Sequence, residues 1–341
     1  MQATASAYYH PGPASRVDQQ AGSSRFPDRF ESTFNGKRVT SHQYYGGATV
    51  PPDGKDVEDA FWEKKPLQKR KITPADVLTV YGMDTSSLRS GFFLQKLCLR
   101  NMRCNRRKIT PDQVIQEFTR MPDRNHKYKL AIARFLDQCC LRRLPLHGQQ
   151  VTPDAVVKGY QATGAALPLA RFIAECCLRR MTMYGQPVTP DLVVKCFQAA
   201  KAPLGIARFK AECCLRRLPL NGQPVTPDAV VKGFRAVRAT LEEARFKAEC
   251  CLRHLPLNGQ TITPDEVVKN YQSVGATLEL ARFKEACCLR NLLLNGQPVT
   301  PDAVVREYER GGWWRERNIF CSQLGLSAGE SKIPARITRR Y

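Results

Sequence analysis

A Thr-Pro dipeptide opens the same phrase seven times along this chain, at a nearly constant spacing. Successive threonines lie 37 residues apart except for one interval of 42, and they are Thr73, Thr110, Thr152, Thr189, Thr226, Thr263 and Thr300. A fixed period of this length is typical of tandem structural repeats that stack on one another. The sequence therefore predicts one elongated array rather than several globular domains.

The phrase itself has the signature of a helix start, clearest in residues 151–187. Thr152 is an expected N-cap, Pro153 suits the first helical position, and Asp154 suits the positive end of the helix dipole. We call this helix A. Its apolar residues fall on one face and Lys158 projects away from it; the apolar face holds Val156, Val157, Tyr160 and Thr163.

A second helix, helix B, is predicted at about residues 169–181. It is apolar on two faces, which suits a helix sandwiched between neighbouring repeats. A turn at Tyr184 to Pro187 then returns the chain to the next Thr-Pro. The predicted fold is all-α: an α-solenoid of about seven two-helix repeats of 37 residues, preceded by a disordered leader.

The predicted organisation has three parts: a leader over residues 1–71, the array over 72–310, and a C-terminal cap and tail over 311–341. Residues 1–66 contain no Leu or Ile, so the leader has little surface to bury. The cap begins where Gly311-Gly312-Trp313-Trp314 replaces the usual helix junction. Its tryptophans are expected to close the open end of the apolar interior.

The 14 cysteines do not form a metal-binding pattern. Ten of them are adjacent pairs at the same point of helix B: Cys139-Cys140, Cys176-Cys177, Cys213-Cys214, Cys250-Cys251 and Cys287-Cys288. Adjacent helical residues point about 100° apart and are poorly placed to chelate one ion. We expect small buried thiols in a reducing compartment, with no metal and no cofactor.

The charge of the chain predicts a polyanionic partner. The formal net charge is +22, from 53 Lys and Arg against 31 Asp and Glu, and it is densest in the first half of the array. Such a surface attracts nucleic acid, acidic proteins or anionic membranes. No apolar run is long enough to span a bilayer.

Three basic positions recur with the repeat, and each has a structural and a binding interpretation. The first is the arginine of Ala-Arg-Phe, for which helical spacing predicts ion pairs such as Arg171 with Glu175; its members are Arg134, Arg171, Arg208, Arg245 and Arg282. The second follows Cys-Leu near the end of helix B, and we assign it a binding role at Arg142, Arg179, Arg216, Arg253 and Arg290.

The third basic position lies on the polar face of helix A, four residues after the Asp of Thr-Pro-Asp. This spacing predicts an exposed ion pair that leaves the cation free to meet a ligand as well. The row is assigned to partner binding at Lys158, Lys195, Lys232, Lys269 and Arg306. If a ligand is recognised in sequence, two sets of varying positions are expected to take part: Gly159, Cys196, Gly233 and Asn270, and Gly164, Lys201, Arg238 and Gly275.

A dense basic run precedes the array and has the composition of a nuclear localisation signal or of a solvated surface segment. Its cations are Lys64, Lys65, Lys69, Arg70 and Lys71. The Ser-rich, polar leader resembles the N-termini of bacterial type III secreted effectors. That resemblance implies secretion into a host cell, and a plain solvated tail is the alternative. Synthesis in the cytosol is expected on other grounds, because the first 30 residues lack the apolar stretch of a secretory signal.

Two repeat families resemble the array. Thr110-Pro111-Asp112-Gln113-Val114 and its copies resemble the opening of transcription activator-like effector repeats, whose two-helix units read one DNA base each. Val231 to Phe234, followed by Thr240 to Ala244, resembles the helix junction of the RNA-binding pentatricopeptide repeats. Both resemblances imply a helical array that binds nucleic acid.

No catalytic constellation stands out, because the five histidines are scattered and no phosphate-binding loop or nucleophile elbow occurs. The sequence therefore predicts a binding protein rather than an enzyme. Nucleic acid is the preferred partner, and an acidic protein gripped by a scaffold is the alternative.

Overall fold

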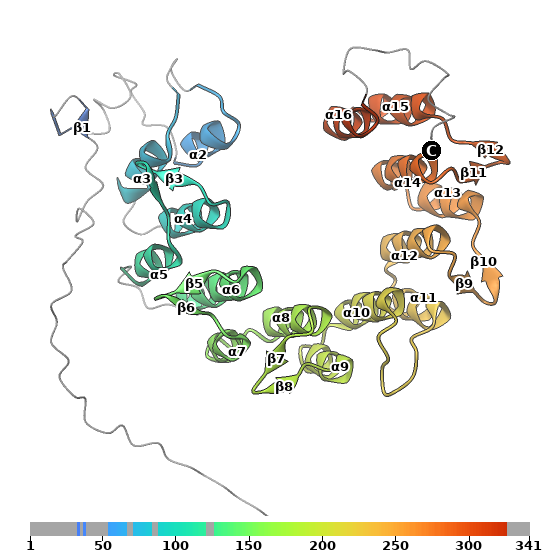
Figure 1. Cartoon of the computed structure of the whole chain (residues 1–341), viewed down its shortest axis with the longest axis horizontal. Coiled ribbons are helices and arrows are strands. Elements are labelled where there is room, and N and C mark those ends of the chain that lie inside the picture. The colour runs from blue at the N-terminus through green and yellow to red at the C-terminus, as the bar shows by residue number, and fades with distance from the viewer. Residues whose placement is uncertain are drawn as a thin grey trace, which may run out of the picture. The chain divides into compact units, whose positions relative to one another are not determined.

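The computed structural model describes residues 33–34, 37–38, 54–66, 71–83, 88–120 and 126–325. The chain divides into two compact units, Met1–Met121 and Pro122–Tyr341. Each is built from helices joined by short turns and β-hairpins (Figure 1).

In the first unit the elements are β1 (Thr33–Phe34), β2 (Lys37–Arg38), α2 (Gly54–Trp62), α3 (Pro74–Met83), α4 (Arg89–Leu99), β3 (Arg103–Cys104), β4 (Arg107–Lys108) and α5 (Pro111–Arg120). The helices of the second unit are α6 (His126–Arg142), α7 (Pro153–Gln161), α8 (Ala166–Leu178), α9 (Pro190–Ala199), α10 (Pro203–Arg216), α11 (Pro227–Ala236), α12 (Thr240–Leu252), α13 (Pro264–Ser273), α14 (Thr277–Leu289), α15 (Pro301–Arg310) and α16 (Trp314–Gln323). Its strands are β5 (Pro145–Leu146), β6 (Gln149–Gln150), β7 (Thr182–Met183), β8 (Gln186–Pro187), β9 (Pro256–Leu257), β10 (Gln260–Thr261), β11 (Leu293–Leu294) and β12 (Gln297–Pro298).

The predicted start of helix A is confirmed. In α7 the Thr152 hydroxyl accepts the amide hydrogen of Ala155 at 3.3 Å, and Pro153 is the first helical residue. The same cap recurs at Thr189, Thr226, Thr263 and Thr300. The expected face of this helix is buried, with Val156 and Tyr160 at most 1% exposed.

Helix B begins one turn earlier than predicted, at Ala166 rather than Leu169. Pro168 was expected to lie before the helix, but it falls in the first turn, where no amide hydrogen is needed. The helix ends with Arg180 in the left-handed conformation, at φ 55°. There the amides of Arg180 and Met181 donate to the carbonyls of Cys177 and Cys176.

A short β-hairpin replaces the simple turn predicted after helix B. β7 pairs antiparallel with β8 across Tyr184 and Gly185, which have φ values of 49° and 76°. Two successive positive φ values are typical of the type I′ turn, whose twist matches that of paired strands. Each repeat is therefore a helix–helix–hairpin unit, and the hairpins remain minor parts of an all-α fold.

Within each unit, helix B packs against helix A of the following repeat, as α8 does against α9 and α10 against α11. In the second unit, helices α8, α10, α12 and α14 follow one side of the row and α9, α11 and α13 the other (Figure 1). Phe172 and Cys176 of α8 are at most 1% exposed because both faces of the helix are covered. The predicted α-solenoid of stacked hairpins is confirmed.

One helix lies inside the segment predicted to be a disordered leader. α2 packs on α3, and its Glu58 accepts a hydrogen bond from the Tyr81 hydroxyl at 2.5 Å. Tyr160 makes the equivalent bond to Asp137 across the same 23-residue spacing, so α2 occupies the place of helix B in a shortened repeat. The prediction of disorder failed here because it considered only Leu and Ile, whereas the apolar side chains that α2 packs are those of Val57, Phe61 and Trp62. The array thus begins by Gly54 rather than at Ile72. Of the rest of the predicted leader, the structure describes only β1, β2, residues 63–66 and residue 71, and the tail from residue 326 lies outside the described residues.

Candidate polyanion-binding surface

Three members of the first arginine row join neighbouring B helices instead of forming the pairs expected within one helix. Arg208 reaches Glu242 at 2.5 Å and Arg245 reaches Glu279 at 2.5 Å, each across 34 residues; Arg282 reaches Glu316 at 3.4 Å. The expected pair of Arg171 with Glu175 is wrong, because that glutamate turns toward Arg179. The repeat geometry brings the next helix B closer to the guanidinium than its own helical neighbour.

The row assigned to binding after Cys-Leu connects successive repeats. Arg179 donates to the carbonyl oxygen of Leu141 at 2.8 Å and also contacts Glu175 at 3.4 Å. Equivalent bonds run from Arg216 to Leu178, from Arg253 to Leu215 and from Arg290 to Leu252. A charged hydrogen bond at a half-exposed site contributes about 1 kcal/mol. Each of these arginines therefore holds the last turn of the preceding helix B.

The lysine row on helix A has a different environment. Lys158, Lys195, Lys232 and Lys269 are exposed, and none makes an ion pair or side-chain hydrogen bond within residues 126–325. Arg306 also lies in this row, but it donates to the carbonyl of Asp302 in its own helix. The row is thus four unpartnered ammonium groups at one repeat position, with a fifth cation that bonds locally.

The aspartates expected to pair with these lysines have another partner. Asp154 accepts the backbone amide hydrogen of Tyr184 at 2.8 Å, across 30 residues. The same bond connects Asp191 with Asn221, Asp228 with Asn258 and Asp265 with Asn295. The predicted Asp–Lys pairs are therefore wrong. Each carboxylate fixes the hairpin tip of its own repeat and leaves the lysine without a direct counter-ion.

Two of the positions expected to read a ligand in sequence lie at contacts between repeats. A methyl group at Gly159 would lie 3.4 Å from the Cβ of Ala133 in the preceding helix B. Asn270 accepts a hydrogen bond from Lys247 of α12 at 3.3 Å. Gly159 and Asn270 thus face the preceding helix B, so the exposed lysine row is the better candidate for contact with a partner.

Buried or partly buried carboxylates accept hydrogen bonds from tyrosine hydroxyls at three contacts between repeats. Burial raises the pKa of Asp137 to about 6, although the Tyr160 hydroxyl donates to it at 2.9 Å, and its Oδ1 has no hydrogen-bond partner. Tyr308 bonds to Glu285 in the same way. At Glu58, burial would raise the pKa, but hydrogen bonds from Lys96, Tyr81 and Trp62 lower it below its usual value. These groups stabilise contacts between repeats and do not form a reactive pair.

The cysteine pairs are packing residues, as predicted. All 14 cysteines are free thiols, and nine of the ten paired ones are buried. Burial raises the pKa of Cys176, Cys213, Cys250 and Cys287 to about 12. Thiols with so little thiolate at neutral pH are poor nucleophiles and ligands. Within the described ranges, no group of three or more His, Cys, Asp or Glu side chains could hold a metal ion.

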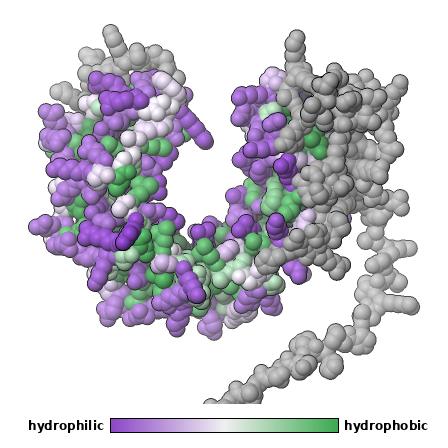
Figure 2. Space-filling view, turned by 180° about the vertical axis from the view of Figure 1, so that it is seen from behind, coloured by the Kyte–Doolittle hydropathy of each residue, from purple (hydrophilic) through white to green (hydrophobic). Residues whose placement is uncertain are grey.

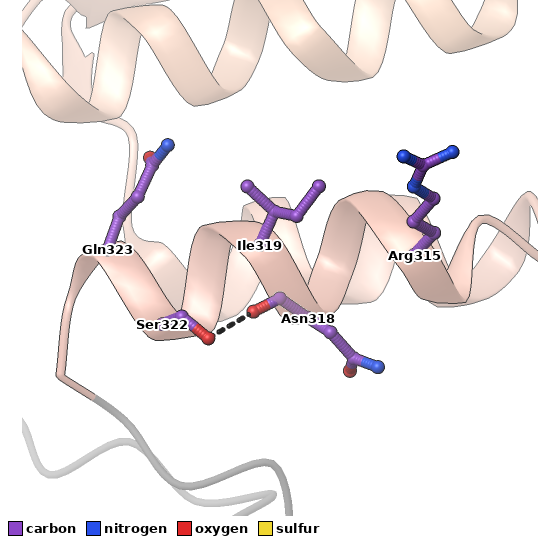
Figure 3. A pocket seen from close by; sticks show the side chains of 5 residues that line it. All are labelled: Arg315, Asn318, Ile319, Ser322 and Gln323. Carbon is purple, nitrogen blue, oxygen red and sulfur yellow. Dashed lines mark hydrogen bonds between the residues drawn. The ribbon is translucent and has the colours of Figure 1, made fainter. Parts of the chain in front are cut away.

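At the C-terminal end an open depression lies on α16 (Figure 3), lined by Arg315, Asn318, Ile319, Ser322 and Gln323. Arg315, Ile319 and Gln323 point from the same side of the helix, and the Ser322 hydroxyl donates to the Asn318 carbonyl at 2.8 Å. Asn318 and Ser322 stand where α8 has the buried Ala170 and Ala174. The stripe that is apolar in α8 is therefore polar at these two positions of α16. Of the two predicted cap tryptophans, Trp313 packs on Tyr308, whereas Trp314 is 57% exposed.

The basic run before the array is only partly described. Lys64, Lys65 and Lys71 are exposed, and Lys65 pairs with Glu63 at 2.6 Å. Lys69 and Arg70 lie outside the described residues. In the part of the chain that the structure describes, no helix combines the length and apolar character needed to cross a bilayer.

Sequence reasoning missed a further set of cations, each next to an arginine of the row that follows Cys-Leu. Arg143, Arg180 and Arg217 follow them directly, are exposed, and have φ values of 55°, 55° and 56°. Glycine and asparagine favour this left-handed conformation, and asparagine takes it at Asn101 and Asn291. The repeated Arg-Arg dipeptide was the available signal. Hydrophilic residues of this kind dominate much of the exposed surface in Figure 2.

No protein-family model and no curated protein matches the chain in sequence.

Proposed function

We propose that the array is a non-catalytic nucleic-acid-binding protein whose lysine row contacts the phosphate backbone. The observation that carries this proposal is that Lys158, Lys195, Lys232 and Lys269 have no ion pair or side-chain hydrogen bond among the described residues, each beside an aspartate that bonds to a hairpin amide instead. If every lysine of the row formed an ion pair, a role in stabilising the fold would be sufficient to explain the row. An unpaired row, repeated at one position, suits a ligand that carries regularly spaced negative charge.

The lysine row supports backbone contact rather than base reading. An ammonium group on a flexible stem acts as a point charge toward phosphate and carries little sequence information. If four phosphates are neutralised, the slope of log K against log salt is about −3.6 for a DNA duplex and about −2.8 for a single strand.

The test compares the unmodified protein with a quadruple variant, Lys158→Ala, Lys195→Ala, Lys232→Ala and Lys269→Ala. Binding to a labelled DNA duplex and to single-stranded RNA is measured by fluorescence anisotropy over a range of salt. We expect the slope to lose about one unit per lysine, whereas the matched Lys→Arg quadruple variant keeps it. Salt-insensitive or absent binding by the unmodified protein rejects the proposal.

An acidic protein is the competing partner, and nuclease treatment separates the two. Capture from lysate is compared with and without nuclease, using the unmodified chain and the variant Lys158→Glu, Lys195→Glu and Lys232→Glu. Recovery of nucleic acid that the variant loses supports the proposal. Nuclease-resistant recovery of one acidic protein, lost in the same variant, assigns the row to that protein instead.

The location of the protein is a separate part of the proposal. We propose delivery as a secreted bacterial effector, on the composition of residues 1–66, and nuclear entry through Lys64, Lys65, Lys69, Arg70 and Lys71. A fluorescent fusion expressed in eukaryotic cells tests the nuclear step. Alanine at the five cations should return it to the cytoplasm, and unchanged nuclear accumulation would reject this role.

A further inference from the structure

The β3–β4 hairpin differs in charge from the equivalent turns of the second unit. The turns at residues 145–150, 182–187, 219–224, 256–261 and 293–298 contain no Lys, Arg, Asp or Glu. The equivalent segment in the first unit is Arg103-Cys104-Asn105-Arg106-Arg107-Lys108, with four cations in six residues. A hairpin that only connects helices has no need of this charge, as the five neutral copies demonstrate.

The backbone of this hairpin places an arginine where the other copies have glycine. Arg106 has a φ of 65°, and the equivalent residues are Gly148, Gly185, Gly222, Gly259 and Gly296, with φ values from 73° to 76°. Glycine takes this conformation without steric cost, whereas a residue with a Cβ is strained there. Strain retained at one copy of a repeated turn points to a use for the side chain.

The hairpin is held firmly while its cations stay unpaired. Cys104 is 5% exposed and β3 packs against α3, so the base of the hairpin is fixed in the first unit. The side chains of Arg103, Arg106, Arg107 and Lys108 are all exposed, and none makes an ion pair or side-chain hydrogen bond with the described residues.

The hydrogen bond that holds the hairpin tip in other repeats has no counterpart here. Asp154 and its copies accept the amide of a hairpin tip 30 residues later. Thirty residues before Asn105 the chain has Ala75. The first hairpin therefore lacks this contact at its tip, and the nearby Asp76 carboxylate lies toward the buried Cys104 at the base of the hairpin and accepts hydrogen bonds from the amide and hydroxyl of Thr73.

We propose that the β3–β4 hairpin is a phosphate-binding finger that grips the backbone of a nucleic acid independently of the lysine row. The inference rests on the proposed function and adds a second contact site to it. Three guanidinium groups around a rigid two-residue turn suit phosphodiester oxygens, because each guanidinium offers a planar pair of donors. The finger is a backbone contact and supplies no base recognition.

The test transfers the neutral sequence of the β9–β10 hairpin to this position. The triple variant Arg106→Gly, Arg107→Gln and Lys108→Thr takes the residues found at positions 259–261. We expect the salt slope for a 20-base-pair DNA duplex to fall by about 2.7, from three phosphate contacts. The thermal midpoint should stay the same or rise, because Arg106→Gly relieves the left-handed strain. Weaker binding with undiminished stability excludes misfolding as the cause.

Two controls define the result. Asn105→Gly changes the same turn without altering charge and should leave the slope unchanged, and Arg106→Lys keeps the charge and should retain most of the binding. If the triple variant binds DNA with the slope of the unmodified protein, the finger is rejected while the lysine-row proposal stands. If the unmodified protein binds phosphatidylserine vesicles but no nucleic acid, and the triple variant loses that binding, both proposals are overturned in favour of a membrane surface.

Discussion

At the scale of single residues, one carboxylate per repeat decides whether a lysine of the row is free. Asp228 accepts the amide hydrogen of Asn258 at 2.7 Å. Asp228→Asn keeps an oxygen that can accept this bond, so its free energy of unfolding should stay within about 0.5 kcal/mol, whereas Asp228→Ala should lose about 1 kcal/mol. Both remove a negative charge near Lys232 and should strengthen nucleic-acid binding at low salt. Denaturant titrations and anisotropy measure the two effects; weaker binding by Asp228→Asn would contradict the assignment.

A second residue, Asp137, makes the stability of the second unit depend on pH, and the sign of that dependence can be predicted. Its pKa is raised to about 6 by burial, with Glu175 adding to the shift and Tyr160 and Arg179 opposing it. The folded state therefore holds this proton more tightly than the unfolded state, whose carboxyl has a pKa near 4. Its stabilising contribution is complete below about pH 4 and is lost as pH rises through about 6.

The measurement is the free energy of unfolding at several pH values for the unmodified protein and for Asp137→Asn, which keeps an acceptor for Tyr160. The difference between the two should change by about 1 to 3 kcal/mol between pH 4 and pH 7, with the unmodified protein losing stability as pH rises. Parallel pH profiles would show that Asp137 is not the responsible group.

At the scale of elements, the end of helix B carries two adjacent arginines with opposite effects on stability. Arg216 holds Glu212 at 3.0 Å and reaches the Leu178 carbonyl, so Arg216→Ala should cost about 1 kcal/mol. Arg217 is exposed, makes no side-chain bond within the described residues, and has a φ of 56°. Arg217→Gly should therefore stabilise the helix end by about 1 kcal/mol. Thermal unfolding of the two variants, side by side, checks this; stabilisation by Arg216→Ala would refute the stapling role.

The same element shows which contacts a sequence can reveal. Caps, amphipathic faces and buried cysteine pairs depend on neighbours within a few residues, and Thr152, Tyr160 and Cys176 were placed correctly on that basis. The ionic partners were not, because they lie one repeat away. Arg208 pairs with Glu242 and Asp154 with Tyr184, at separations of 34 and 30 residues, where helical spacing offered nearer partners. Only the stacking geometry selects among them.

At the scale of the whole second unit, stability depends on contacts between neighbouring repeats, so the position of a core defect matters as much as its size. Phe209 in α10 is 3% exposed with repeats on both sides, and Phe320 in α16 is fully buried in the last repeat. Each Phe→Ala change removes about 3 to 5 kcal/mol of local stability. Because repeats contact only their neighbours, a defect at Phe209 should separate the flanking segments, whereas one at Phe320 should loosen only the end.

Calorimetry and hydrogen exchange test this difference. Phe209→Ala should divide thermal unfolding into two transitions and lower protection in α9 to α12, whereas Phe320→Ala should lower it in α15 and α16 alone. The terminal variant keeps all four row lysines in folded repeats, so it should bind nucleic acid with an unchanged salt slope. For the central variant, the slope of log K against log salt should become shallower on warming past the first transition, because some of the row lysines then lie in unfolded repeats. Uniform loss of protection in both variants would mean that the repeats unfold as one body, and the stacked interfaces could not then be the units of stability.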